Sequence, residues 1–254
     1  MARQPTAAEI IACLPAADSF ARIISHETTG STNDDVRSLL SAGEPSPALV
    51  AAATQSAGRG RRGNLWQNTP GAPLFFSVGL TVTTDPALRS MLSPAAAVAL
   101  AETLEEFCQL PVGIKWPNDL VVEDRKVCGL LLESMPNGSI VIGVGLNLNT
   151  TDEWFEKNEL PLASSISIDP ADRTPLLAAL ASSLLGIEER VAESTELQSA
   201  FDRRDVLVGQ VVHCMDGPTP HTGRVHEIDL IRGLTLDIDG DRLLLSPHTI
   251  RVLP

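Results

Sequence analysis

Up to about residue 204 the chain alternates between two hydrophobic periodicities, and this alternation is the feature that most limits its fold. Short apolar runs typical of buried strands are separated by stretches whose apolar residues recur with helical spacing. The expected elements are helices at 7–14, 34–41 and 93–108, strands at 21–27, 48–54, 74–81, 112–115 and 140–147, a hairpin turning near 123–126, and helices from Pro175 to about 192 and over 196–204. This order predicts a sheet with helices packed on it.

The pattern changes after residue 205. Short runs with strand-like alternation are separated there by turn sequences, and Asp239-Gly240 is a strong signal for a two-residue hairpin turn. Several short strands in so small a segment indicate a small β-barrel. We therefore expect an α+β protein with two domains, a core of residues 1–204 and a barrel of residues 205–254.

Charge and cysteine content restrict the partners and the compartment. The chain has 19 Lys and Arg against 32 Asp and Glu, a formal net charge of -13, which disfavours nucleic acid and anionic membranes as partners. No apolar segment approaches the roughly 20 residues that span a bilayer. The four cysteines form no C-x-x-C pair and nothing near the start resembles a signal peptide, so we expect a cytoplasmic protein. His213, Cys214, His221 and His226 fit no familiar zinc spacing, and we expect no metal site there.

Residues 58–63 match the dinucleotide-binding pattern G-x-G-x-x-G, but the match is misleading. That motif must lead into a helix that holds a pyrophosphate, whereas here the chain continues to Pro70 within a long loop. The segment instead places Arg59, Arg61 and Arg62 between glycines, in a stretch without acidic residues. This composition suits a flexible clamp for phosphate or carboxylate, although a basic loop is more often a solvated surface loop.

Three further segments carry polar groups at positions where a ligand could bind. Lys115–Asp119 closes a predicted strand with a Trp-Pro turn, although an ordinary Asn-Asp turn is equally compatible. Lys126 precedes a buried strand that contains Gly129, and a lysine there is ordinarily a solubilising charge. Ser31–Asn33 fits a helix N-cap, and its hydroxyl and amide groups could also bind a small polar ring.

Taken in order, these motifs closely resemble the biotin protein ligase family. The resemblance rests on Ser31–Asn33, on Thr54–Gly63 with Trp66, on Lys115–Asp119, on Lys126–Gly129 with Glu133, and on Gly143–Asn147. It implies a mixed β-sheet with packed helices, followed by a small SH3-like β-barrel. It also implies an enzyme that uses ATP and Mg²⁺ to convert biotin to biotinoyl-5′-AMP, and then transfers the biotinoyl group to a lysine of a biotin carboxyl carrier protein domain.

The resemblance assigns roles to individual residues. Biotin or its adenylate would contact Ser31, Thr32, Asn33, Gln55, Gly58, Arg59, Gly60, Arg61, Lys126 and Gly129. ATP would lie near Arg62, Trp66, Lys115, Asn118, Gly129 and Asn147. Lys126, Arg59 and Arg61 would be catalytic by stabilising charge at the α-phosphate, while Mg²⁺ would come with ATP and need no protein metal site. The chain departs from the family pattern at Asn64, often Arg or Lys, and at Cys128, often Ala.

Two other functions remain as alternatives. A lipoate or octanoate protein ligase shares the core fold and the adenylation chemistry, but the Gly-Arg motif and Lys115–Asp119 favour biotin. Some family members carry an N-terminal winged-helix domain and act as biotin-responsive repressors. Because few residues precede Ser31 and the net charge is acidic, we expect a ligase without a DNA-binding role rather than a non-catalytic biotin sensor. Both a monomer and a homodimer are compatible with the sequence.

Overall fold

The computed structural model describes residues 3–15, 19–247 and 250–253. Its larger part is a seven-stranded sheet in the order β1-β2-β3-β7-β6-β5-β4. The strands are β1 (Arg22–Thr29), β2 (Ala48–Gln55), β3 (Leu74–Thr81), β4 (Gly113–Lys115), β5 (Asp119–Val122), β6 (Arg125–Ser134) and β7 (Ser139–Leu146). β1 and β2 are parallel and every other neighbouring pair is antiparallel, so the sheet is mixed, as predicted.

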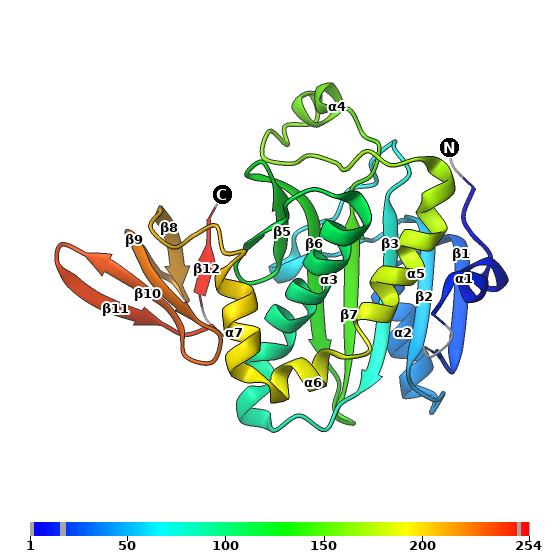
Figure 1. The fold of residues 1–254 in the computed structure, drawn as a ribbon, viewed down its shortest axis with the longest axis horizontal. Coiled ribbons are helices and arrows are strands. Elements are labelled where there is room, and N and C mark those ends of the chain that lie inside the picture. The colour runs from blue at the N-terminus through cyan, green and yellow to red at the C-terminus, as the bar shows by residue number, and fades with distance from the viewer. Residues whose placement is uncertain (1–2, 16–18, 248–249, 254) are drawn as a thin grey trace.

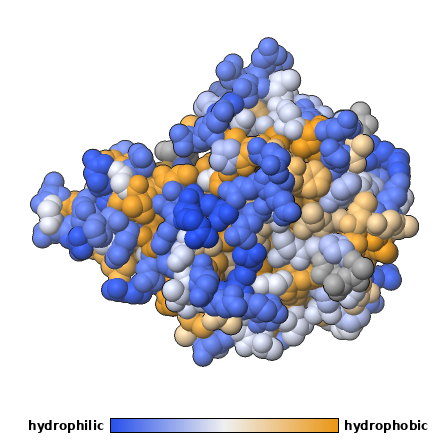
Figure 2. All heavy atoms as spheres, viewed as in Figure 1, coloured by the Kyte–Doolittle hydropathy of each residue, from blue (hydrophilic) through white to orange (hydrophobic). Residues whose placement is uncertain are grey.

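Helices cover the two faces of this sheet unequally (Figure 1). One face carries α2 (Thr32–Ser41), the crossover that links the parallel strands β1 and β2. The other face carries α3 (Leu92–Cys108), together with α5 (Arg173–Ser183), α6 (Ile187–Ala192) and α7 (Ser194–Asp202), while α1 (Ala7–Cys13) packs on α5. Polar and apolar side chains are interspersed over the surface of this helix-covered face (Figure 2).

Alternation along the strands divides the core between the two faces. On β2, Leu49 and Ala51 belong to the large core beneath α3 and α5, whereas Val50 packs with Val36 and Leu40 of α2. α2 is short and contacts only part of its face, mainly β2, β3 and β7. The remainder of that face, over β6 and β7, is left for a pocket.

Within residues 150–192 one helix was missed and one expectation was wrong. The segment after β7 contains a helix, α4 (Asp152–Lys157), which its polar composition concealed. The single helix expected from Pro175 to about residue 192 begins earlier, at Arg173, and is two helices that are interrupted before Gly186. Two serines at the end of α5 and the glycine before α6 have low helix propensity, which explains the interruption.

Residues beyond 210 form a second, antiparallel sheet in the order β11-β10-β9-β8-β12. Its strands are β8 (Val211–Asp216), β9 (Thr219–Asp229), β10 (Gly233–Ile238), β11 (Asp241–Leu245) and β12 (Ile250–Val252). Asp239 and Gly240 have φ of 52° and 94°, which confirms the predicted two-residue hairpin turn. Within the described part of the chain, the strand pairings leave β11 and β12 as the two edges of this sheet. The number of strands in this second sheet and their order support the predicted SH3-like fold of the C-terminal domain.

The connection between the two sheets lies against β4. The backbone N–H of Ile114 donates to the carbonyl of Arg204 at 2.7 Å, and the N–H of Val206 donates back to Ile114 at 3.2 Å. Apolar side chains of both sheets belong to one continuous core. In the described ranges, no helix combines the length and the apolar character that crossing a membrane requires.

Candidate active site

A pocket lies on the face of the large sheet that α2 covers only in part. Its wall combines the start of α2, the end of β2, the loop after β2, and the middle of β6 and β7. The lining residues are Ser31, Thr32, Asn33, Gln55, Arg59, Gly60, Arg61, Trp66, Asn118, Lys126, Gly129, Leu130, Leu131, Gly143, Val144 and Gly145. Most of them are residues that the sequence singled out for biotin or ATP, although these are spread over almost a hundred positions.

Three glycines of β6 and β7 form the floor of this pocket. A Cβ atom added to Gly143 would lie 2.1 Å from Oδ1 of Asn33, and one added to Gly145 would lie 2.5 Å from the Trp66 ring. A Cβ atom on Gly129 would lie 2.6 Å from the same ring. Side chains of more than a hydrogen atom are therefore excluded from the floor, and Asn33 and Trp66 can approach the sheet backbone.

We expect Gly143→Ala to weaken ligand binding by displacing Asn33. Overpacking of this kind costs about 1–3 kcal/mol, and the strain falls on the pocket rather than on the core. Titration calorimetry with biotin would measure the loss. Gly186→Ala is the matched control, because the nearest atom to its added Cβ is 3.8 Å away and lies outside the pocket. Equal biotin affinity in both variants would contradict the assigned role of the glycine floor.

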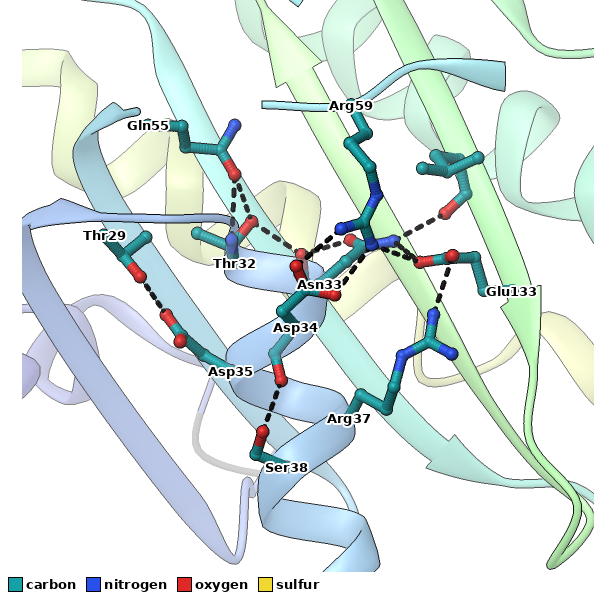
Figure 3. Close-up of polar contacts among 12 residues, drawn as sticks. Thr29, Thr32, Asn33, Asp34, Asp35, Arg37, Ser38, Gln55, Arg59 and Glu133 are labelled. Carbon is teal, nitrogen blue, oxygen red and sulfur yellow. Dashed lines mark hydrogen bonds and ion pairs between the residues drawn. The ribbon is translucent and has the colours of Figure 1, made fainter. Parts of the chain in front are cut away.

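Above the floor, a polar network joins the start of α2 to β2 and β3 (Figure 3). The backbone N–H and hydroxyl of Thr32 donate to Oε1 of Gln55 at 2.8 and 3.2 Å. The hydroxyl of Ser77 lies 2.7 Å from Oγ1 of Thr32 and 2.6 Å from Oδ1 of Asn33. Because Thr32, Asn33 and Ser77 are buried and the four groups are bonded to one another, they are held in fixed orientations.

Sequence reasoning missed Ser77, which is fully buried on β3. The available signal was a single hydroxyl within an otherwise apolar strand, since a buried polar group needs partners. The sequence also suggested that Ser31 is the N-cap of the following helix. Ser31 does occupy the N-cap position of α2, but its side chain makes no capping hydrogen bond. Its hydroxyl is therefore available to the pocket.

Arg59 reaches from the loop to the start of α2 and to β6 (Figure 3). Its Nη1 and Nη2 donate to the two carboxylate oxygens of Asp34 at 2.5 and 2.7 Å, and Nη2 is 3.5 Å from Oε2 of Glu133. Glu133 is also paired with Arg37 at 2.7 Å and accepts a hydrogen bond from Nδ2 of Asn33 at 2.7 Å. The hydrogen bonds from Arg59 lower the pKa of Asp34, and Asp34 raises the pKa of Arg59.

Lys126 lies at the opposite side of the pocket. Its Nζ is 2.7 Å from Oδ1 of Asp119 and 5.2 Å from the centre of the Trp66 ring. The pairing of β5 with β6 shifts register between Leu120 and Val121. As a result, the residue of β6 that directly follows Lys126 has no pairing partner on β5. Such a bulge redirects side chains, which explains why Lys126 points into the pocket rather than along the sheet edge.

Arg61 is the third cation in the lining. Its Nη1 donates to Oδ1 of Asn118 at 3.2 Å, and Nδ2 of Asn118 donates to the carbonyl of Leu130 at 2.6 Å. A basic loop residue is thus connected to β6 through the Trp-Pro-Asn turn. Lys126, Arg59 and Arg61 thus give the pocket three cationic side chains, in a chain whose net charge is -13.

The loop after β2 is folded as a small hairpin. The Gly60 N–H donates to the Asn64 carbonyl at 2.7 Å, the Trp66 N–H donates to the Gly58 carbonyl at 3.0 Å, and Arg59 and Leu65 form a β-bridge. Farther along, buried Arg173 donates to the carbonyls of Ala72 and Pro73 at 3.1 and 2.8 Å. The loop therefore has fixed points at both ends.

Comparison with known proteins identifies this pocket's relatives. Residues 25–149 match the model of the biotin/lipoate A/B protein ligase family, and they include every lining residue. The chain belongs to the biotin/lipoate A/B protein ligase family. It is 29% identical to the biotin–[acetyl-CoA-carboxylase] ligase of Mycobacterium tuberculosis over 86% of this chain and 84% of that one. It is also 29% identical to the bifunctional ligase/repressor BirA of Escherichia coli, over 73% of this chain but 60% of that protein.

Solved structures of family members share the whole fold. The biotin protein ligase from Aquifex aeolicus in complex with biotin and ATP aligns with a TM-score of 0.69 over 92% of this chain and 99% of that one, at 21% sequence identity. Its apo structure aligns with a TM-score of 0.73 at 18% identity. At this level of identity the likeness is one of fold, and it extends over both sheets.

Several residues singled out by the family resemblance do not line the pocket. Gly58 is part of the loop hairpin, where its carbonyl accepts from the Trp66 N–H, and Lys115 lies at the end of β4. Asn147 is buried and donates through Nδ2 to the carbonyl of Ser164 at 3.0 Å, so it holds the neighbouring segment. The side chain of Arg62 lies outside the described residues.

The two departures from the family pattern have different consequences. Cys128 is buried among core residues, and its burial raises the pKa of the thiol to about 12. Its side chain is not in the pocket lining, so this departure does not change the groups that face a ligand. Asn64 lies at the end of the loop's short helical turn, where its N–H bonds to Arg61, and its side chain is exposed.

Proposed function

We propose that the protein is an ATP-dependent biotin protein ligase that activates biotin and transfers it to a lysine of a carrier protein. One observation carries this proposal: a single pocket combines a fixed hydrogen-bonding network with three cationic side chains. A ligand that fits must combine a small polar ring with an anion. Biotin and its adenylate have this construction, with a ureido ring, an aliphatic chain and a carboxylate or phosphate.

The ureido ring requires both hydrogen-bond donors and acceptors. We assign its recognition to Ser31, Thr32, Asn33 and Gln55, with Ser77 holding Thr32 and Asn33 in place. We propose that Gly60 and Gly129 allow the protein backbone to approach the aliphatic chain of biotin closely. Trp66 and Asn118 would lie on the side of the pocket that binds the nucleotide. Gly58, Lys115 and Asn147 would support these residues from behind.

In the first step, an oxygen of the biotin carboxylate attacks the α-phosphorus of ATP, the bond to the β-phosphate oxygen breaks, and pyrophosphate leaves. Two anions must meet for this to happen. Lys126, Arg59 and Arg61 would offset their repulsion and stabilise the charge that grows on the α-phosphate oxygens. Mg²⁺ would accompany the triphosphate and shield the leaving pyrophosphate, and we assign no protein ligand to it.

In the second step, the amine of a carrier lysine attacks the biotinoyl carbonyl, AMP leaves, and an amide bond forms. We propose a biotin carboxyl carrier protein domain as the acceptor. The ATP requirement and the four free cysteines, Cys13, Cys108, Cys128 and Cys214, support a cytoplasmic location. We further propose residues 1–204 as the catalytic domain and residues 205–254 as an SH3-like domain, in a monomer or homodimer.

Incubation with ATP, Mg²⁺ and either biotin or lipoate tests the proposal. Mass spectrometry of the retained acyl-adenylate should detect biotinoyl-AMP, because the network of Thr32, Asn33 and Gln55 is matched to a polar ring and not to a dithiolane. Exclusive formation of lipoyl-AMP would assign the protein to the lipoate branch of the family. Retention of biotin without consumption of ATP would indicate a sensor rather than a ligase.

We expect this chain not to bind duplex DNA specifically at physiological salt, with or without biotin. A net charge of -13 makes the electrostatic part of DNA binding unfavourable. A gel-shift assay with genomic fragments, with the bifunctional E. coli relative on its own operator as the positive control, would measure this. Sequence-dependent binding at nanomolar concentrations would contradict the expectation.

A further inference from the structure

The guanidinium of Arg59 lines the pocket but is already bound by carboxylates of the protein itself (Figure 3). Its two terminal nitrogens donate to the two oxygens of Asp34 at 2.5 and 2.7 Å. A ligand carboxylate or phosphate that binds an arginine in a bidentate manner uses the same kind of parallel N–H pair. Such a ligand therefore has to compete with Asp34 for Arg59.

The two carboxylates next to Arg59 differ in how firmly they are held. Glu133 is 24% exposed and has Arg37 and Asn33 as additional partners at 2.7 Å each. The Asp34 side chain is 49% exposed, and in the described part of the chain the hydrogen bonds of its carboxylate all come from Arg59. Water can solvate a half-exposed carboxylate at little cost. A ligand can therefore displace Asp34 from Arg59 more easily than it can displace Glu133.

We propose that Asp34 is an internal anion that occupies Arg59 in the ligand-free enzyme and is displaced by the carboxylate or phosphate of the ligand. This inference rests on the proposed function to the extent that the ligand is an acid activated through its adenylate. Asp34 is a positioning residue: it holds Arg59, and through Arg59 the loop between Gly58 and Gly60, against the start of α2. It also makes recruitment of Arg59 depend on an anion in the pocket.

The test compares an anionic ligand with its neutral isostere. In Asp34→Asn, the competing charge is gone while the helix start keeps a side chain of the same shape. Calorimetry should give biotin a dissociation constant about fivefold lower than in wild type, the size expected for an ion pair at a half-exposed site. The affinity for biotinamide, which carries no charge, should be unchanged. A purely structural role of Asp34 would move both affinities together.

Asp35 provides a matched control in the same helical turn. Its carboxylate accepts from the hydroxyl of Thr29 at 2.6 Å and lies 3.8 Å from Nε2 of His26, so it is engaged on the β1 side of the helix and not with Arg59. Asp35→Asn should change neither affinity. In the double variant Asp34→Asn with Arg59→Gln, the gain for biotin should vanish, because the cation released by the first substitution is missing.

Each other result has a defined meaning. The inference would be overturned if Asp34→Asn bound biotin as well as or more weakly than wild type, or if its affinities for biotin and biotinamide changed equally. In that case, adenylation of biotin by the wild type would still support the proposed function. If Asp34→Asn does not fold, Asp34→Ser replaces it at the same helix position. If the wild type activates lipoate instead, lipoate and lipoamide form the test pair. A wild type that binds neither acid would overturn the proposed function and this inference with it.

Discussion

Lys126→Ala is expected to abolish adenylate formation, with a loss of at least about 100- to 1000-fold in the rate of pyrophosphate exchange. Removing one preorganised group that stabilises transition-state charge has an effect of that size. The fold should remain intact, because the side chain is 35% exposed and its pair with Asp119 is a partly solvated one. Exchange of labelled pyrophosphate into ATP, in the presence of biotin, measures the step directly.

Two control variants separate the lost cation from its side effects. Lys157→Ala removes a lysine from the last turn of α4, at a site with no role in the proposed chemistry, and should behave as wild type. Lys126→Ala combined with Asp119→Asn removes the carboxylate that the single substitution leaves without its lysine partner. If the double variant regains wild-type exchange, the loss came from the charge of Asp119. If the single variant keeps wild-type exchange, Lys126 is only a solubilising residue.

Arg61→Gly is expected to release biotinoyl-AMP about 10- to 150-fold faster than wild type. Charge-assisted hydrogen bonds contribute roughly 1.5–3 kcal/mol each, and Arg61 would make such bonds to the adenylate as the loop closes over it. Escaped adenylate reacts with any lysine, so added bystander protein should become biotinylated. Blotting with streptavidin after incubation with ATP and biotin measures this labelling.

Limited proteolysis provides an independent measure of loop closure. Biotin with ATP should slow cleavage by trypsin after Arg59, Arg61 and Arg62. Trp66 packs on the floor at Gly129 and Gly145 and gives the loop an apolar anchor. Cleavage in the free enzyme should accordingly be slow enough to follow. Equal cleavage rates with and without ligands, together with no bystander labelling by Arg61→Gly, would show that the loop does not retain the adenylate.

Local chemistry explains why much of the fold could be predicted from the sequence. The strand predicted over 74–81 coincides with β3, and the helix predicted from residue 93 starts only one residue after the true start of α3, because each is specified by its own apolar pattern. The turn at Asp239-Gly240 is specified by two residues that tolerate positive φ. The break before α6 was missed because serine and glycine lower helix propensity without by themselves ending a helix.

The sequence by itself determined the secondary structure of most segments, the family, and the residues that line most of the pocket, because periodicity, turn chemistry and short motifs are properties of neighbouring residues. Only the tertiary structure decided how those residues act on one another. Asn33 bonds Glu133 from 100 positions away, and Arg59 lies between Asp34 and Glu133 because β6 is hydrogen-bonded to β7 and β7 to β3. Contacts of this kind depend on the order of strands in the sheet. Local patterns do not encode that order, so the internal competition for Arg59 became visible only in three dimensions.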